Sequence, residues 1–131
     1  MKKSLFVVLT ALALSAGSLF AQEIPAFDKP DSVVLDVSSL KGKFKDSVRL
    51  INLTEEKNIG FSVYYYEQKG KNAGWQLYGH AQLKGYSDTA SVDSKQEGKI
   101  RKVKYFAVVS EKGIGFKCSV EARNHDLHIS V

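Results

Sequence analysis

Aromatic and polar side chains alternate along two neighbouring segments of this sequence, residues 60–67 and 75–83. If these segments pair as a hairpin, alternation sends one set of side chains to the same outer sheet face. The expected cross-strand pairs are Ser62 with His80, Tyr64 with Tyr78, and Tyr66 with Gln76. Tyrosine rings beside hydroxyl, amide and imidazole groups suit the binding of sugars or peptides. We therefore predict a binding face, with purely structural aromatic pairs as the alternative.

Metal binding is the second function that the sequence could indicate, because two imidazoles and a carboxylate fall within His125-Asp126-Leu127-His128. These groups are common zinc ligands. In an extended strand, however, side chains three positions apart point to opposite faces. His125 and His128 could share a metal only if the chain turned back, with His80 as a remote third ligand. We expect no metal site and no cofactor.

No catalytic arrangement is recognisable in the sequence. A nucleophile beside a base, or paired carboxylates, would indicate an enzyme. Ser87, Ser91 and Ser94 lie in a polar stretch without a nucleophile elbow, and Asp88 and Asp93 have no marked neighbour. A non-enzymatic protein is the expectation, and an enzyme built from dispersed residues is the alternative.

Positive charge is spread along the chain, with the densest cluster at residues 99–104. The net charge of the 131 residues is +5, and it falls to +3 without Lys2 and Lys3. So small an excess, without a dedicated fold, predicts no nucleic-acid partner. We expect the cluster to be the solvated start of a strand, with contact to an anionic envelope lipid or polysaccharide as the alternative.

The single cysteine, Cys118, can form no internal disulfide, so the hydrophobic core must hold the fold by itself. Cys118 alternates with Phe116, Val120 and Ala122 along one face of an extended segment. It is expected to be a small buried apolar side chain, and a reactive or intermolecular thiol is the alternative.

Period-two alternation of apolar and polar residues recurs along the chain and indicates half-buried antiparallel strands. The alternating segments are 33–37, 75–83, 116–122 and 127–131. Three other segments, 47–53, 60–67 and 100–110, are apolar or aromatic in both phases, which is typical of central strands. Alternation up to Val131 indicates that the chain ends as a paired strand.

Seven or eight short strands separated by turn-forming residues predict an all-β protein, an antiparallel two-sheet sandwich. Trp75 and Tyr105 resemble the aromatic anchors of immunoglobulin-like or fibronectin-like sandwiches, which implies that architecture here. The cysteine pair of immunoglobulin domains is absent from the sequence. Residues 32–131 are expected to form this single domain after an irregular lead-in at residues 22–31.

The first 21 residues have the pattern of a secretory signal peptide. Lys2 and Lys3 precede an apolar run, residues 5–14, and small residues lead to the expected cleavage after Ala21, with Ser18 as the alternative. No apolar run after residue 21 reaches the roughly 18 residues of a transmembrane helix. The sequence predicts export to the periplasm or the cell exterior.

These features favour a small exported protein of a bacterial envelope that binds another envelope protein without catalysis. An exposed strand edge or the predicted face of Tyr64, Tyr66, Gln76, Tyr78 and His80 would make the contact. The alternative is a carbohydrate-binding module that uses the same tyrosines to bind an envelope polysaccharide.

Overall fold

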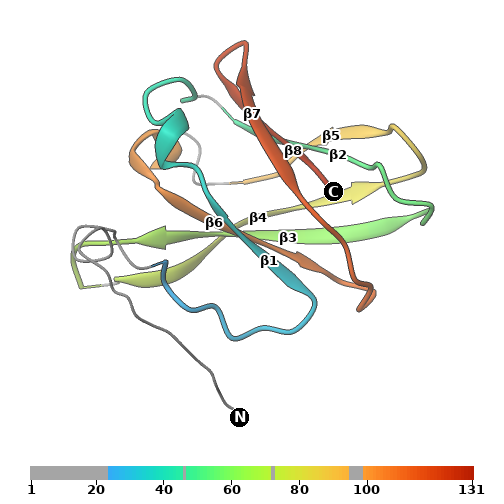
Figure 1. Ribbon diagram of the computed structural model, residues 1–131, viewed down its shortest axis with the longest axis horizontal. Coiled ribbons are helices and arrows are strands. Elements are labelled where there is room, and N and C mark those ends of the chain that lie inside the picture. The colour runs from blue at the N-terminus through green and yellow to red at the C-terminus, as the bar shows by residue number, and fades with distance from the viewer. Residues whose placement is uncertain (1–23, 46, 72, 95–98) are drawn as a thin grey trace, which may run out of the picture.

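The computed structural model describes residues 24–131 apart from residues 46, 72 and 95–98. The expected signal peptide, residues 1–21, lies outside the described residues. The described chain forms two four-stranded sheets that enclose a shared hydrophobic core (Figure 1). The structure is all-β and consistent with a sandwich, and the eight strands agree with the predicted seven or eight.

The first sheet, sheet A, has the strand order β1-β6-β3-β4. Its members are β1 (Ser32–Asp36), β3 (Ile59–Glu67), β4 (Gly74–Leu83) and β6 (Tyr105–Ser110). All its strand pairs are antiparallel. β3 and β6 occupy the central positions, which agrees with their apolar character in both phases.

The second sheet, sheet B, has the strand order β5-β2-β8-β7. Its members are β2 (Val48–Ile51), β5 (Thr89–Ser91), β7 (Ser119–Arg123) and β8 (Asp126–Ser130). β2 and β8 run parallel, an exception to the antiparallel arrangement that the sequence predicts. Parallel neighbours need a long connection, and here the whole chain between them, including most of sheet A, supplies it.

A tight turn through Asn124 and His125 joins β7 to β8. Both residues have positive φ, 54° and 68°, which is the backbone of a two-residue hairpin turn of the primed type. β8 ends at Ser130, and the pairing with β2 extends to the last residue, because the Val131 amide donates to the Ile51 carbonyl at 2.9 Å. The prediction that the chain ends as a paired strand is confirmed.

The strand predicted over residues 100–110 begins later than expected. Residues Lys99–Lys102 form a 3₁₀ helix, η3, in which Ile100 is buried. The Val103 amide donates to the Ile100 carbonyl at 3.0 Å, and both side chains are buried. Apolar residues three apart on one side favour a helical turn over strand alternation, so β6 starts only at Tyr105.

A second 3₁₀ helix, η2, covers Ser38–Leu40. Each of these helical segments of the described chain is a single short turn, and neither has the length or apolar character to cross a membrane.

The core lies between the sheets and takes large side chains from both. The largest fully buried ones are Phe44, Phe61, Phe106, Leu50, Ile59, Leu83, Ile100, Leu127, Ile129, Val37, Val48 and Val63. Full burial of such a side chain contributes roughly 1.5–3 kcal/mol each. A core of this kind stabilises the two sheets without a disulfide.

The position of β8 in the middle of sheet B gives a test of this packing. We expect Ile129→Ala to lower the free energy of unfolding by about 2–5 kcal/mol, because it leaves a cavity between the sheets. Ser130→Ala, one residue later on the opposite face, is the matched control and should change it by less than about 0.5 kcal/mol. Chemical denaturation measures both, and equal effects would contradict the assigned facing of β8.

Candidate functional site on the outer face of sheet A

The β3–β4 hairpin confirms one predicted cross-strand pair and contradicts the other two. The pairs near the predicted face are Ser62 with His80, Tyr64 with Leu77, Tyr65 with Gln76, and Tyr66 with Trp75. The register shifts between Val63 and Tyr64, where β4 carries one extra residue, Tyr78. This β-bulge reverses the facing of every β4 residue before it.

The bulge lies next to Gly79, where residues 92–93 cross the free edge of β4. The His80 amide donates to the Asp93 carbonyl at 3.3 Å, and the Asp93 amide donates to the His80 carbonyl at 2.9 Å. A Cβ at position 79 would lie 2.2 Å from the Asp93 carbonyl oxygen. Glycine inside a strand often marks a bulge or a close backbone approach, and here it marks both.

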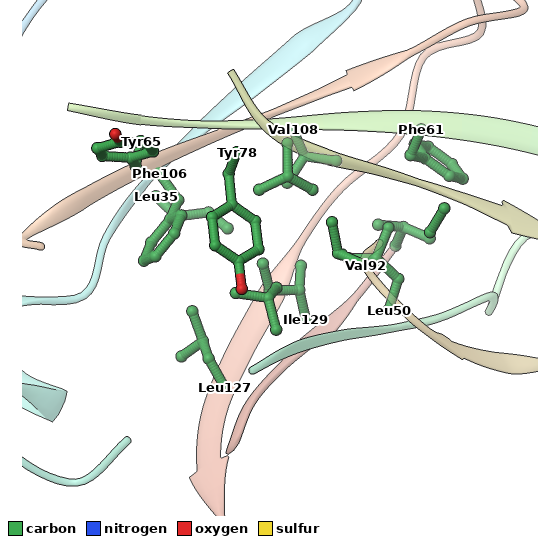
Figure 2. Close-up of a cluster of buried hydrophobic side chains, with 14 of the residues drawn as sticks. Leu35, Leu50, Phe61, Tyr65, Tyr78, Val92, Phe106, Val108, Leu127 and Ile129 are labelled. Carbon is green, nitrogen blue, oxygen red and sulfur yellow. The ribbon is translucent and has the colours of Figure 1, made fainter. Parts of the chain in front are cut away.

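Tyr78 and Gln76 therefore do not belong to the outer face. Tyr78 is buried, at 2% exposure, and points from β4 between the sheets in the direction of Leu127 and Ile129 (Figure 2). Its ring packs edge-on against Phe106, with centroids 6.4 Å apart. Gln76 pairs with Tyr65, whose side chain is part of the core cluster, and so shares the inner face. The prediction of both as outward-facing is wrong because it continued the alternation through Gly79.

Trp75 and Leu77, which strict alternation places in the core, lie on the outer face instead. Trp75 packs edge-on against Tyr66 with centroids 5.3 Å apart, and Tyr66 lies 6.4 Å from Tyr105. Tyr105 is only 2% exposed although it is not part of the core between the sheets. Leu77 is 55% exposed. The outer face thus has a well-packed aromatic end and an exposed leucine beside it.

The N-terminal segment, residues 24–31, crosses this aromatic end. Phe27 packs against Tyr64 and Trp75, with ring centroids 5.2 and 5.0 Å away. The Trp75 indole N–H donates to the Ala26 carbonyl at 2.8 Å. Lys29 Nζ lies 5.6 Å from the centre of the Tyr64 ring, a cation–π distance. The expected lead-in is irregular, but it is bound to the sheet.

We call Phe27, Tyr64, Tyr66, Trp75 and Tyr105 the aromatic cluster. Three of its members, Phe27, Trp75 and Tyr105, are not among the predicted site residues. Gly79 in the middle of a strand was a signal for Trp75, because a bulge there turns it outward. Nothing local in the sequence indicates that Phe27 folds back, because that contact joins residues far apart in the chain.

A polar group lies on the same face, toward the other end of the hairpin. Glu111, which directly follows β6, accepts a hydrogen bond from Ser62 Oγ at 3.0 Å. The same carboxylate oxygen is 2.6 Å from His80 Nδ1. In a serine hydrolase the hydroxyl donates to the imidazole. Here the Ser62 hydroxyl donates to the Glu111 carboxylate and not to the His80 imidazole, so Ser62 and His80 do not form the nucleophile–base pair of that mechanism.

The histidines near the C-terminus do not converge with a third ligand. His125 lies in the β7–β8 turn and is exposed, whereas His128 lies in β8 opposite Glu121 and is buried. Within the described ranges, no three His, Cys, Asp or Glu side chains are grouped to hold a metal ion. Both ring nitrogens of His128 are buried, and no described group forms a hydrogen bond with them.

Cys118 packs against the core from the same side as Phe116, Val120 and Ala122, as the alternation predicts. Burial raises the pKa of the Cys118 thiol to about 12. The thiol is therefore protonated at neutral pH, and a protonated thiol is a poor nucleophile.

The chain matches no protein-family model, and it has no match among the curated proteins or the solved structures.

The bulge can be tested by comparing two adjacent residues. We expect Tyr78→Ala to lower the free energy of unfolding by about 3–5 kcal/mol, because it removes a buried aromatic side chain. Leu77→Ala should cost less than about 1 kcal/mol, because Leu77 is largely exposed. Urea denaturation distinguishes the two. A larger loss of unfolding free energy in Leu77→Ala than in Tyr78→Ala would mean that Leu77 is the buried residue, and this would contradict the bulge.

The raised pKa of Cys118 predicts slow alkylation. At pH 8 the folded protein should react with iodoacetamide on the order of a hundredfold or more slowly than the urea-unfolded chain, since the thiolate is the nucleophile. Burial of the protonated thiol stabilises the fold below the ordinary pKa of 9. This contribution is lost as the pH rises from 9 toward 12. Equal alkylation rates in the two states would contradict the burial.

Proposed function

We propose that this chain is an exported, non-enzymatic protein of a bacterial envelope and that the outer face of sheet A binds another envelope protein. The observation that carries the proposal is that the N-terminal segment, residues 24–31, packs on this face. Phe27 packs against Tyr64 and Trp75, and the Trp75 indole N–H donates a hydrogen bond to the Ala26 carbonyl. A face that binds an extended peptide within its own chain has the chemistry to bind one from a partner.

The uncovered part of this face has the composition of a protein contact. Leu77 is an exposed apolar residue next to Tyr64, its cross-strand neighbour. The Ser62, His80 and Glu111 group adds hydrogen-bonding side chains at one border. Protein interfaces commonly combine an apolar or aromatic centre with a polar rim.

Two of the strand edges are less suited to the contact than this face. Asp93 already pairs with His80 on the edge of β4. The edge strand β7 carries exposed Glu121 and Arg123, and charged side chains on an edge oppose pairing with another chain. These features favour binding through the face over strand addition at those edges.

Carbohydrate binding remains the second proposal for the same face. It rests on a hollow of about 350 Å³ lined by Ile24, Pro25, Ala26 and Tyr66, where a sugar could contact the tyrosine ring. Phe27 already packs against Tyr64 and Trp75, which leaves less open ring surface for a sugar. Because Phe27 covers part of the Tyr64 and Trp75 rings, a protein partner is favoured over a sugar.

Export and the immunoglobulin-like type belong to the same proposal. Export rests on the signal-peptide pattern of residues 1–21. The immunoglobulin-like type is supported by the pairing of β2 with β5 and of β3 with β6, which corresponds to strands B with E and C with F. The remaining connections differ from that fold, because β1 pairs with β6, β8 pairs with β2, and β7 pairs with β8 in sheet B and not with β6.

The proposal is tested by co-sedimentation with the insoluble envelope of the producing cells. Protein purified after expression of the full chain should bind the envelope, and protease treatment of the envelope should abolish binding. We expect Leu77→Glu to weaken binding by more than about tenfold, because it places a charge in the centre of the contact. Its melting temperature should stay near that of the wild type.

Tyr86→Glu is the matched control, since it adds the same charge at a tyrosine that is 72% exposed and outside the aromatic cluster. It should bind like the wild type. Binding that survives protease but is weakened in Leu77→Glu would support a glycan on this face and the carbohydrate alternative. Wild-type binding by Leu77→Glu would exclude this face, and no binding by the wild type would exclude an envelope partner.

A further inference from the structure

Four lysines from three separate parts of the chain meet around one hollow. The hollow has a volume of about 370 Å³ and is lined by Lys41, Gln68, Lys69, Lys102 and Lys104. We call it the lysine hollow. Lys102 and Lys104 belong to the basic cluster of the sequence, whereas Lys41 and Lys69 come from segments that no pattern connects with it.

Buried anchors hold the lysine hollow in place. Lys102 and Lys104 flank Val103, whose side chain is 6% exposed. The Lys104 carbonyl accepts a hydrogen bond from the Val37 amide at 2.8 Å, which ties this segment to the end of β1. Lys41 follows η2, where its amide donates to the Ser38 carbonyl at 3.2 Å. These backbone hydrogen bonds position the segments that carry Lys41, Lys102 and Lys104.

The third side of the lysine hollow is the turn between β3 and β4. Gln68 and Lys69 directly follow β3, and Gly70 has a φ of 97° that lets the chain turn back toward β4. Lys69 therefore lies at the end of the hairpin opposite to Lys57 and Lys84, which precede β3 and follow β4.

The charge balance at the lysine hollow favours an anion. None of its lining residues is acidic. Outside the lining, hydrogen bonds from Ser38 lower the pKa of the Asp36 carboxyl, and Lys104 contributes to this lowering to a smaller extent. Because four lysines line one hollow, their ammonium groups repel one another, and a bound anion reduces that repulsion.

We propose that the lysine hollow binds the phosphate groups of a phosphorylated polysaccharide. Ammonium groups are strong hydrogen-bond donors to phosphate oxygens. The Gln68 side chain, which is both a donor and an acceptor, suits the hydroxyl groups of the attached sugar. The volume falls in the usual range for small-ligand sites, so it accommodates a sugar phosphate unit. This inference concerns a different surface from the proposed protein contact and does not depend on it.

Membranes and nucleic acids fit the lysine hollow less well. Basic surfaces that bind bilayers commonly add apolar side chains that enter the lipid. The exposed large hydrophobic residues of the described chain are Ile24, Leu53, Leu77 and Tyr86, and none of them lines the hollow. Single-stranded nucleic acids are bound with aromatic side chains that stack on bases, and the lining contains no aromatic residue. A water-borne sugar phosphate polymer matches the lining better than either.

Binding of phosphomannan to protein purified after expression of the full chain tests this inference. Calorimetry at low salt should detect binding that weakens steeply when salt is added, because the contacts are ionic. The double variant Lys69→Glu, Lys102→Glu should weaken it by more than tenfold. The matched control Lys57→Glu, Lys84→Glu makes the same change in net charge at exposed lysines near the opposite end of the β3–β4 hairpin, and should weaken it by less than twofold. Melting temperatures of both variants verify folding.

Further ligands separate the possible sources of binding. Dephosphorylated mannan should not bind, and inorganic phosphate should compete only at high concentration. Equal weakening by the two double variants, or equal binding of the dephosphorylated polymer, would overturn the inference. Binding to phosphatidylglycerol vesicles that is lost in Lys69→Glu, Lys102→Glu would replace it with a membrane contact. Failure of phosphomannan to bind would also overturn it and would leave the result of the envelope test unaffected.

Discussion

The fold leaves no room for a side chain at residue 79, and much of the surrounding structure depends on that constraint. A Cβ there would meet the carbonyl oxygen of Asp93 and the side chain of Val92. Because residue 79 is glycine, Asp93 can pair with His80 on the edge of β4, directly after Val92, whose amide still donates to Val48 of sheet B. The contact covers an edge that would otherwise expose unpaired backbone groups.

The bulge beside Gly79 decides which side chains at the start of β4 face the core and which face the surface. Tyr78 turns inward and adds a large aromatic ring to a core that has no disulfide to support it. Trp75 turns outward and becomes the partner of Phe27. One extra residue in a strand therefore decides both which tyrosine stabilises the sandwich and which aromatic residue holds the N-terminal segment.

The two proposed surfaces differ in chemistry and in the way the fold builds them. The outer face of sheet A is a strand surface, where paired neighbours fix the spacing of Tyr64, Leu77 and His80. The lysine hollow is made of loops whose backbones are anchored by buried residues such as Val37 and Val103. A rigid face suits a partner recognised by shape, whereas long lysine side chains suit an anion recognised mainly by charge.

Local patterns in the sequence were sufficient for the all-β class, the number of strands and the central places of β3 and β6, because period-two alternation reflects the faces that each strand buries. They also placed Ser62 opposite His80 and turned Cys118 toward the core. Tyr78 and Gln76 were misplaced since a bulge breaks the period, and its cause, the approach of Asp93, is a tertiary contact. Three other features join residues that are distant in the chain. They are the parallel pairing of β2 with β8, the packing of Phe27 on Tyr64, and the four lysines that line one hollow. Only the packing of the whole molecule decides such contacts, because alternation within one segment carries no information about which other segment will lie beside it.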